Sequence, residues 1–345
     1  MTLPARLVLM TAALAAASRA FGAPAVDPGI PSYEPRDAAP PAGAGYVLTD
    51  GTVQIVAFRD FEGAIRALNG LFAKSHPSIR FKVIPADSAA VIDSLTFDAT
   101  AFAPIPVQFA GGQQYAHYAH GPVFGVRVAH ASLNPEAKVS PLAVIVNGSN
   151  PLRRLSMDQL KRILTQGGRA TDITEWNQVG VTGGTARREI HRIGLPWMDQ
   201  YPAEDPSFGE VLFHRTFGGA EPASNYESVP RYDEVVERVS QDPLAIGVTA
   251  INRVTSAVKA VELTTTGWST PVRGTEEEII SGAYPLDRFV YINVRLVSGK
   301  PFDPLAREYL RMVLSKEGQA AIAGDARGYL PLNSTEVGVE LAKLR

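Results

Sequence analysis

Residues Pro141–Gly180 read PLAVIVNGSNPLRRLSMDQLKRILTQGGRATDITEWNQVG and carry several local structure signals in a row. An apolar run at Leu142–Val146 stops at Asn147-Gly148, a pair that is typical of turns. Ser156 has Gln159 three residues later, which is the spacing of a helix-capping box. Apolar residues then recur on one side of that helix, and Trp176 stands in the polar loop beyond it. The stretch predicts a buried strand, a turn, a short amphipathic helix and a loop anchored by an aromatic side chain.

The composition is that of an ordinary globular protein with two lobes. The chain has 345 residues, more than a single hydrophobic core usually supports, with 45% hydrophobic and 20% charged residues. Its formal net charge of −2 argues against a nucleic-acid binder or a protein that binds membranes through a basic patch. Beyond the N-terminus there is no apolar run of 18 or more residues, so no further membrane span is predicted.

The first 23 residues resemble an export signal. Arg6 supplies a positive start, Leu7–Ser18 an apolar core, and the small residues of Ala20–Ala25 two alternative cleavage sites. An uncleaved anchor is the other reading, although the apolar core is short for a bilayer. Removing residues 1–23 takes away two arginines and no acids, so the net charge becomes 33 − 2 − 35 = −4.

The absence of cysteine narrows the expected location further. It excludes disulfides, thiol catalysis and a lipid-modified N-terminal cysteine. An exported, unlipidated chain without disulfides suits the bacterial periplasm. Residues 24–45 are rich in Pro, Ala and Gly, and we expect them to form a disordered leader.

The next hundred residues begin with a strand–helix–strand unit. Residues 52–58 predict a strand, Asp60 the N-cap of a helix that runs to Ser75, and residues 79–84 a second strand. Asp87-Ser88 can cap another short helix. Such a unit predicts a parallel sheet with its loops gathered at the carboxyl ends of the strands. Later strands are expected at residues 123–128, 189–194, 245–249, 257–263 and 289–294, and later helices at 208–217, 232–241 and from Asp303-Pro304 onward.

Three later segments and the stretch quoted above share the motif order of one family. They read VVERVSQDPLAIGVT (Val235–Thr249), YPLDRFVYINV (Tyr284–Val294) and AREYLRMVLSKEGQAAIAGDARGYLPL (Ala306–Leu332). Together with the first strand–helix–strand unit, they cover most of residues 50–335. The chain resembles the phosphate-type periplasmic solute-binding proteins of ABC transporters, whose members belong to the PBP-like superfamily.

The resemblance implies a type II periplasmic-binding-protein fold, α/β and two-lobed, each lobe a mixed, mainly parallel sheet flanked by helices. It places lobe 1 at residues 46–141 and 275–345, lobe 2 at 142–274, and the hinge at Val146 and Asn147. A small ligand would bind in the cleft, without a cofactor, and an ABC permease or a membrane sensor would receive it. A monomer is expected.

The chain departs from the family at the loops that hold phosphate. After the first strand it has Phe58–Glu62, whose two carboxylates would repel a dianion. The family's R-x-x-x-S-G-T loop is missing, and Leu195 stands about where its arginine should be. An arginine fork is the strongest anion contact a protein has. The ligand therefore stays open between phosphate and another anion or small solute.

Six residues are candidates for ligand contacts, and each has a structural alternative. Arg59 and Asp60 could form a surface ion pair and a helix cap, and Ser88 could be a plain cap. Trp197 could pack in its own loop rather than stack on a ligand. The resemblance puts the family's phosphate-contacting aspartate near Thr100. Arg192 could replace the lost arginine if the loop takes another path.

Motifs for metal binding and catalysis are weak or missing. His117 and His120 have H-x-x-H spacing, which alone makes half a metal site. G-x-S-x-G, H-E-x-x-H and G-x-x-x-x-G-K-[ST] do not occur. We expect a binding protein and no enzyme. The alternatives are a family member that has lost ligand capture and acts as a periplasmic interaction or sensing protein, and a hydrolase on the same fold.

Overall fold

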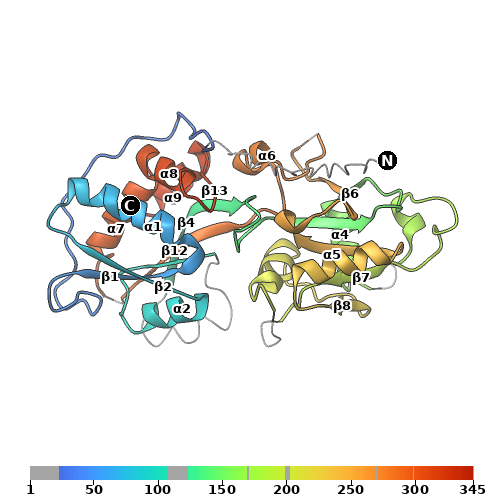
Figure 1. Cartoon of the computed structure of the whole chain (residues 1–345), viewed down its shortest axis with the longest axis horizontal. Helices are drawn as coiled ribbons and strands as arrows, with labels where there is room; N and C mark the ends of the chain where they lie inside the picture. The colour runs from blue at the N-terminus through green and yellow to red at the C-terminus, as the bar shows by residue number, and fades with distance from the viewer. Residues whose placement is uncertain are drawn as a thin grey trace, which may run out of the picture.

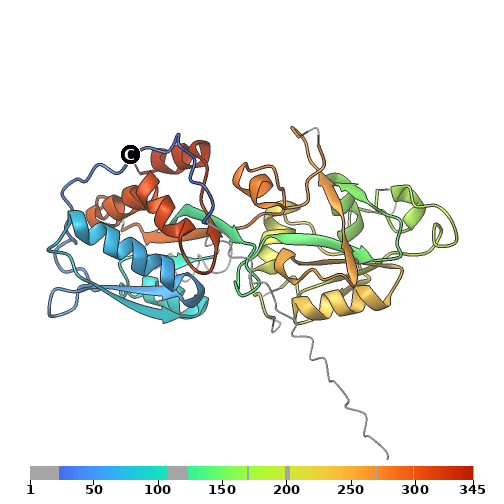
Figure 2. The same cartoon turned by 45° about the horizontal axis from the view of Figure 1, so that its top comes forward.

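The chain forms two lobes that lie side by side along its longest axis, joined by crossing strands (Figures 1 and 2). The computed structural model describes residues 23–106, 123–168, 171–198, 203–268, 270–297 and 299–344. Residues 1–22, which are nearly all of the export signal expected at 1–23, lie outside the described residues, as do His117 and His120. Each lobe has its own hydrophobic core, so the two-lobed α/β fold expected from the sequence is confirmed.

Lobe 1 starts with the predicted strand–helix–strand unit. β1 (Val53–Phe58) pairs in parallel with β2 (Phe81–Ala86), and α1 (Glu62–Ser75) connects them. The inner face of α1 buries Ile65, Leu68 and Phe72. Next come α2 (Ser88–Thr96), which Asp87 caps as predicted, and β3 (Ala103–Ile105).

The last part of the chain returns to lobe 1. α7 (Pro304–Val313) follows the cap Asp303 with proline at its start, as the sequence predicts. After it come α8 (Lys316–Ala323), β13 (Tyr329–Leu330) and α9 (Ser334–Ala342).

The main sheet of lobe 1 is antiparallel rather than mainly parallel. Its strand order is β13-β4-β12-β3, with β4 at Val123–Ser132 and β12 at Phe289–Arg295, and all three pairings are antiparallel. The reason is that β4 leads out of lobe 1 toward the crossing while β12 leads back in. Two strands that carry the chain in opposite directions can only pair antiparallel.

Lobe 2 is built on a mixed five-stranded sheet of order β10-β5-β9-β7-β8. β7 pairs in parallel with β8 and β9, whereas β5 is antiparallel to β9 and β10. The bounds of these strands are β5 Leu142–Asn147, β7 His191–Gly194, β8 Tyr226–Ser228, β9 Ala245–Ala250 and β10 Val258–Ala260. The strand expected at 257–263 divides at Val261 into β10 and β11 (Glu262–Thr264), and β11 pairs with β6 (Arg154–Ser156).

The helices of lobe 2 follow the sequence closely. The capping box of Ser156 and Gln159 opens α4 (Met157–Leu164), and Trp176, fully buried, starts η2 (Trp176–Val179). The others are η3 (Glu210–Thr216), α5 (Tyr232–Gln241), η4 (Ile251–Arg253) and α6 (Glu276–Ile280).

The two crossings lie between β4 and β5 and just before β12, so the hinge predicted at Val146 and Asn147 is wrong. Both residues lie at the far end of β5 and pair with β10 inside lobe 2. The Asn147 side-chain amide donates to the carbonyls of Val239 (3.1 Å) and Ser240 (2.8 Å), which ties the strand end to α5. An asparagine held in this way fixes a strand rather than bending it.

Two other expected boundaries differ from the structure. Ile279, Tyr284 and Leu286 pack in the core of lobe 2, so the second crossing follows them instead of preceding residue 275. The supposed disordered leader is a strap on lobe 1, in which Ile30 is buried. Its Tyr33 hydroxyl donates to Glu308 (2.8 Å), and Asp27 accepts from the backbone N–H of Ser334 (2.8 Å). A few buried side chains and hydrogen bonds thus outweigh its Pro- and Ala-rich composition.

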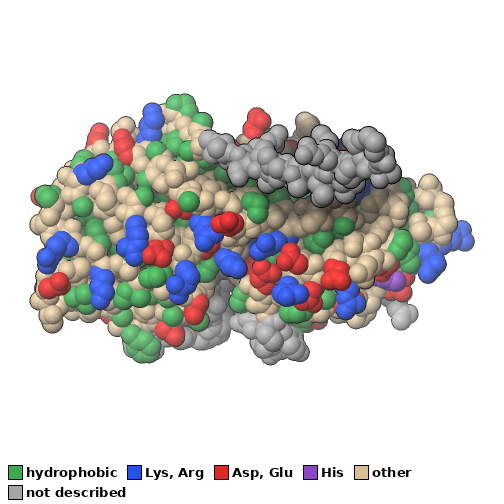
Figure 3. All heavy atoms as spheres, viewed as in Figure 1, with side chains coloured by type: hydrophobic (Ala, Val, Ile, Leu, Met, Phe, Trp, Pro, Cys, Tyr) green, Lys and Arg blue, Asp and Glu red, His purple; other side chains and the backbone are tan. Residues whose placement is uncertain are grey.

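The visible surface has no field of one sign. Basic and acidic side chains alternate over both lobes on the face shown in Figure 3, in line with the net charge of −2. Among the helices of the described residues, none has the length and apolar character needed to cross a membrane.

Candidate ligand site between the lobes

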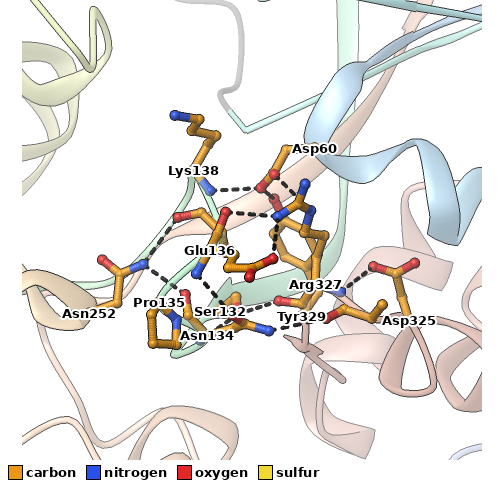
Figure 4. A network of polar contacts seen from close by, with 12 residues as sticks. Asp60, Ser132, Asn134, Pro135, Glu136, Lys138, Asn252, Asp325, Arg327 and Tyr329 are labelled. Atoms are coloured by element: carbon orange, nitrogen blue, oxygen red, sulfur yellow. Dashed lines mark hydrogen bonds and ion pairs between the residues drawn. The ribbon is translucent and has the colours of Figure 1, made fainter.

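Asp60 anchors the first crossing instead of capping α1. The N-cap of α1 is Phe61, and Asp60 is buried. Its Oδ2 accepts from the backbone N–H of Lys138 and the hydroxyl of Tyr329, both at 2.8 Å, and its Oδ1 lies 3.2 Å from Arg327 Nε (Figure 4). The carboxylate therefore joins the start of α1 to the crossing and to β13.

Asn252 holds the same crossing from the side of lobe 2. Its side-chain amide donates to the carbonyls of Asn134 (2.9 Å) and Ala137 (3.0 Å), as Figure 4 shows. On the lobe 1 side, the hydroxyl of Ser132 donates to the carbonyl of Arg327 (2.6 Å). The first crossing is thus clamped by one amide from lobe 2 and by a polar network from lobe 1.

Replacing Asn252 by alanine should lower the free energy of unfolding by about 1–3 kcal/mol, because two crossing carbonyls lose their donor. Urea unfolding followed by circular dichroism measures this, with an unchanged slope expected. A midpoint equal to that of the parent chain would show that the clamp carries no stability.

At the second crossing, Arg288 reaches into lobe 2. Its Nη1 lies 2.5 Å from Asp205 Oδ2 and its Nη2 donates to the hydroxyl of Ser207 (2.7 Å). The hydroxyl of Tyr232 donates to the same Asp205 oxygen at 2.7 Å. Burial raises the pKa of Asp205, but the Arg288 charge and these hydrogen bonds outweigh it and hold that pKa below its usual value. Both Asp205 and Arg288 are therefore charged at neutral pH.

A buried histidine lies on the lobe 1 side of the second crossing. His130 on β4 is fully buried, with Nδ1 2.6 Å from Asp287 Oδ2 and Nε2 2.9 Å from Glu336 Oε2. Burial lowers its pKa, but the two carboxylates outweigh this and raise the pKa to about 9. His130 is therefore an imidazolium at neutral pH that links β4, the crossing and α9.

Arg59 and Ser88 are brought to the same edge of lobe 1. β1 and β2 are parallel neighbours, so α1 and α2 start side by side at their carboxyl ends. Arg59 is exposed, and its Nη2 is 3.5 Å from the carbonyl of Pro85. Ser88 is the first residue of α2 and is half-buried, while the cap is Asp87. Both residues therefore keep a position at which a ligand could reach them.

Arg192 is a structural residue of the lobe 2 core. It is 2% exposed, and its guanidinium donates to the carbonyls of Ile163, Ile173 and Ile190 and to the side chain of Asn225. Burial lowers its pKa. All of these acceptors are neutral groups of lobe 2, so nothing here supports the candidate role of Arg192 in ligand binding.

Thr100 is also used inside its own lobe. It is 1% exposed, its Oγ1 accepts from the backbone N–H of Val56 (2.9 Å), and its hydroxyl donates to the carbonyl of Phe102 (2.7 Å). It ties β1 to the segment that leads into β3. Its single proton is already donated and its side chain is buried, so it has no donor to offer a ligand.

Replacing Thr100 by valine should cost about 1–3 kcal/mol of stability, since a buried N–H and a buried carbonyl lose their partner. Solute binding should not change. Urea unfolding and a titration on the folded variant test the two parts separately, and weaker binding in a folded variant would return Thr100 to the ligand site.

Trp197 is half-buried against the core of lobe 2. A Cβ built on Gly209 would lie 1.9 Å from the Trp197 carbonyl oxygen, so the Trp197 loop depends on this glycine. The tryptophan thus packs on lobe 2 while part of it stays exposed, and its role as a ligand contact stays a prediction.

Few local signals in the sequence point to Asp205, Arg288 and His130 as site residues. Arg288 and Asp287 do stand between the apolar segments Tyr284–Leu286 and Phe289–Val294, a position where charges are rarely left unpaired. Their partners are 83 and 157 residues away in sequence, which no local pattern reveals. Within the described residues, no three His, Asp or Glu side chains are grouped so as to hold a metal ion.

Comparison with known proteins agrees with this architecture. The chain is 26% identical over 333 residues to the phosphate-binding protein PstS of two Pseudomonas aeruginosa strains, covering 96% of this chain and 94% of the relative. The crystal structure of PstS from Borrelia burgdorferi superposes with a TM-score of 0.52 at 17% identity, covering 82% of this chain and 99% of that one. A family model described as PBP superfamily domain matches residues 47–317. Because that match spans more than half of the chain, the protein belongs to the PBP superfamily.

Proposed function

We propose that this protein is a periplasmic solute-binding protein that captures a small ligand, phosphate or another small anion or solute, between its lobes and presents it to an ABC permease. The observation that carries the proposal is the likeness to a phosphate-binding protein along 96% of the chain. The two crossings support it, because lobes joined by two short segments can close by hinge motion. The export signal expected at residues 1–23 supports a periplasmic location. We also propose that the protein acts as a monomer and not as an enzyme.

The edge of lobe 1 that holds Arg59 and Ser88 is the best place for the ligand. The starts of α1 and α2 lie there together, and the first N–H groups of a helix favour an anion. Arg59 is exposed and can turn toward a ligand. A solute held at this edge and contacted by lobe 2 only after closure would favour the closed state.

Thermal unfolding in a panel of oxyanions and small organic solutes tests the proposal. A solute at 100 times its Kd should stabilise the chain by about 2.7 kcal/mol. Arg59→Gln should weaken an anion's effect, while Arg66→Gln, which removes a paired arginine from the exposed side of α1, should not. A response that is the same in both variants would place the ligand elsewhere.

A second function has one observation in its favour. Asp60, Thr100 and Arg192 are all buried and hydrogen-bonded within the scaffold, so three of the six expected ligand contacts serve it instead. This favours a family member that acts as a periplasmic interaction or sensing protein. If none of the solutes in the panel stabilises the protein, the interaction or sensing role is favoured over solute capture. Turnover of chromogenic phosphate esters would instead support a hydrolase.

A further inference from the structure

We propose that Asp205 is a tethered occupant of an oxyanion site formed by Arg288, Ser207 and Tyr232, and that it keeps free oxyanions out of this site. The site lies where the second crossing meets lobe 2. Its existence does not depend on the proposed function, whereas its consequence for ligand choice does.

The groups around the Asp205 carboxylate are those that bind a small oxyanion. Oδ2 receives the Arg288 guanidinium at 2.5 Å and the Tyr232 hydroxyl at 2.7 Å. Oδ1 receives the backbone N–H of Ser207 at 3.0 Å and its hydroxyl at 2.6 Å. One arginine, two hydroxyls and a backbone N–H thus converge on a single carboxylate, and charge-assisted bonds of this kind are the strongest a protein offers to an anion.

The site is shielded from water, which strengthens it. Arg288 is 3% exposed, Asp205 8% and Tyr232 2%. The Nε of Arg288 is buried and has no hydrogen-bond partner among the described residues. The Asp205 carboxylate therefore compensates the buried charge of Arg288, and the Nε–H of Arg288 is left without an acceptor in the described part of the chain.

A free anion cannot compete with Asp205 while the carboxylate is attached to the chain. Covalent attachment gives Asp205 an effective concentration far above that of a dissolved anion. An entering oxyanion would also leave Asp205 buried without a partner and next to a like charge. Under the proposed function, this restricts any anionic group of the ligand to the edge with Arg59 and Ser88.

Removing the carboxylate should open the site. The experiment compares the parent chain with Asp205→Ala, in thermal unfolding with sodium formate, sodium acetate and inorganic phosphate, against sodium chloride at equal ionic strength. Asp233→Ala is the matched control, because it removes an exposed carboxylate beside Tyr232. At 100 times its Kd, formate should raise the folded-to-unfolded ratio of Asp205→Ala about 100-fold and leave the parent and Asp233→Ala unchanged.

A second variant makes the result specific to the arginine. In Asp205→Ala combined with Arg288→Met, the buried charge is gone, so formate should have no effect. If Asp205→Ala does not accumulate as folded protein in chloride, the folded yield after refolding in formate against chloride gives the same readout. Equal formate responses of the single and the double variant would overturn the proposal. It would also be overturned if formate stabilised the parent chain and the single substitution Arg288→Met abolished that effect. Because these probes do not require the natural ligand, a negative result here is distinct from failure of solute capture.

Discussion

Replacing Arg192 by leucine is expected to lower the free energy of unfolding by at least about 3 kcal/mol. The guanidinium serves the buried carbonyls of Ile163, Ile173 and Ile190, and each buried acceptor left without a donor costs about 1–3 kcal/mol. Leucine fills part of the space but supplies no N–H. Urea unfolding followed by tryptophan fluorescence measures the loss, which should come from a shift of the midpoint at unchanged slope.

Arg59→Leu is the matched control, because it makes the same chemical change at an exposed position. Its effect on stability should stay within about 0.5 kcal/mol. For ligand binding we expect the reverse: Arg59→Leu should weaken the affinity, and Arg192→Leu should leave it unchanged. A stable Arg192→Leu variant that no longer binds a solute would contradict the assignment of Arg192 to the core.

The protein should lose about 2.5 kcal/mol of stability as the pH rises from about 7 to about 10 because of His130 alone. Its pKa is about 9 in the folded chain against an ordinary value of 6.5, and each pKa unit corresponds to about 1.4 kcal/mol. The folded state binds the proton more tightly, so the contribution is complete below pH 6.5 and is lost as the pH passes through 9. Burial raises the pKa of Asp287, whereas its hydrogen bond with His130 lowers it.

The comparison with His130→Gln isolates this contribution. Glutamine keeps a polar group between Asp287 and Glu336 but does not titrate, so the variant should be less stable at neutral pH and lack the alkaline loss. Urea unfolding of both chains at several pH values between 6 and 10 gives the difference. Parallel stability curves for the two chains would mean that His130 is not charged in the folded protein.

Local patterns in the sequence predicted the local structure well. Capping boxes and apolar spacing depend on residues three or four positions apart, and so α4, α1 and the caps at Asp87 and Asp303 lie where expected. The family motifs lie in strands and helices that build the two cores, which is why they identified the scaffold and covered most of the chain.

The hinge and the candidate site depended on contacts that no local pattern contains. Leu142–Asn147 reads as a buried strand, but only the pairing with β9 and β10 shows that its end lies deep in lobe 2. Thr100 and Arg192 are polar residues of the kind that line ligand sites, and they are buried because their partners come from other strands and loops. Residues 24–45 gain their order from α7, α8 and α9, more than 250 positions away.

Both crossings are held by the chain's own carboxylates, Asp60 at the first and Asp205 at the second. Each accepts hydrogen bonds that an anionic ligand could otherwise use. The lobes therefore meet around internal ion pairs. Under the proposed function, a ligand would be held farther out, by the exposed edge of lobe 1 and by groups that lobe 2 brings to it on closure. The same two carboxylates thus stabilise the crossings and occupy the groups that could bind an anionic ligand there.

Lobe closure can be measured directly because the chain contains no cysteine. Cysteines introduced at the exposed positions Asp93 on α2 and Glu227 on β8 would carry a donor and an acceptor dye on the two lobes, on the same side of the molecule (Figure 1). If the protein captures a solute between its lobes, the solute that stabilises it in thermal unfolding should shorten the distance between the dyes, with the same saturation curve. Binding of that solute with an unchanged distance would contradict capture between the lobes.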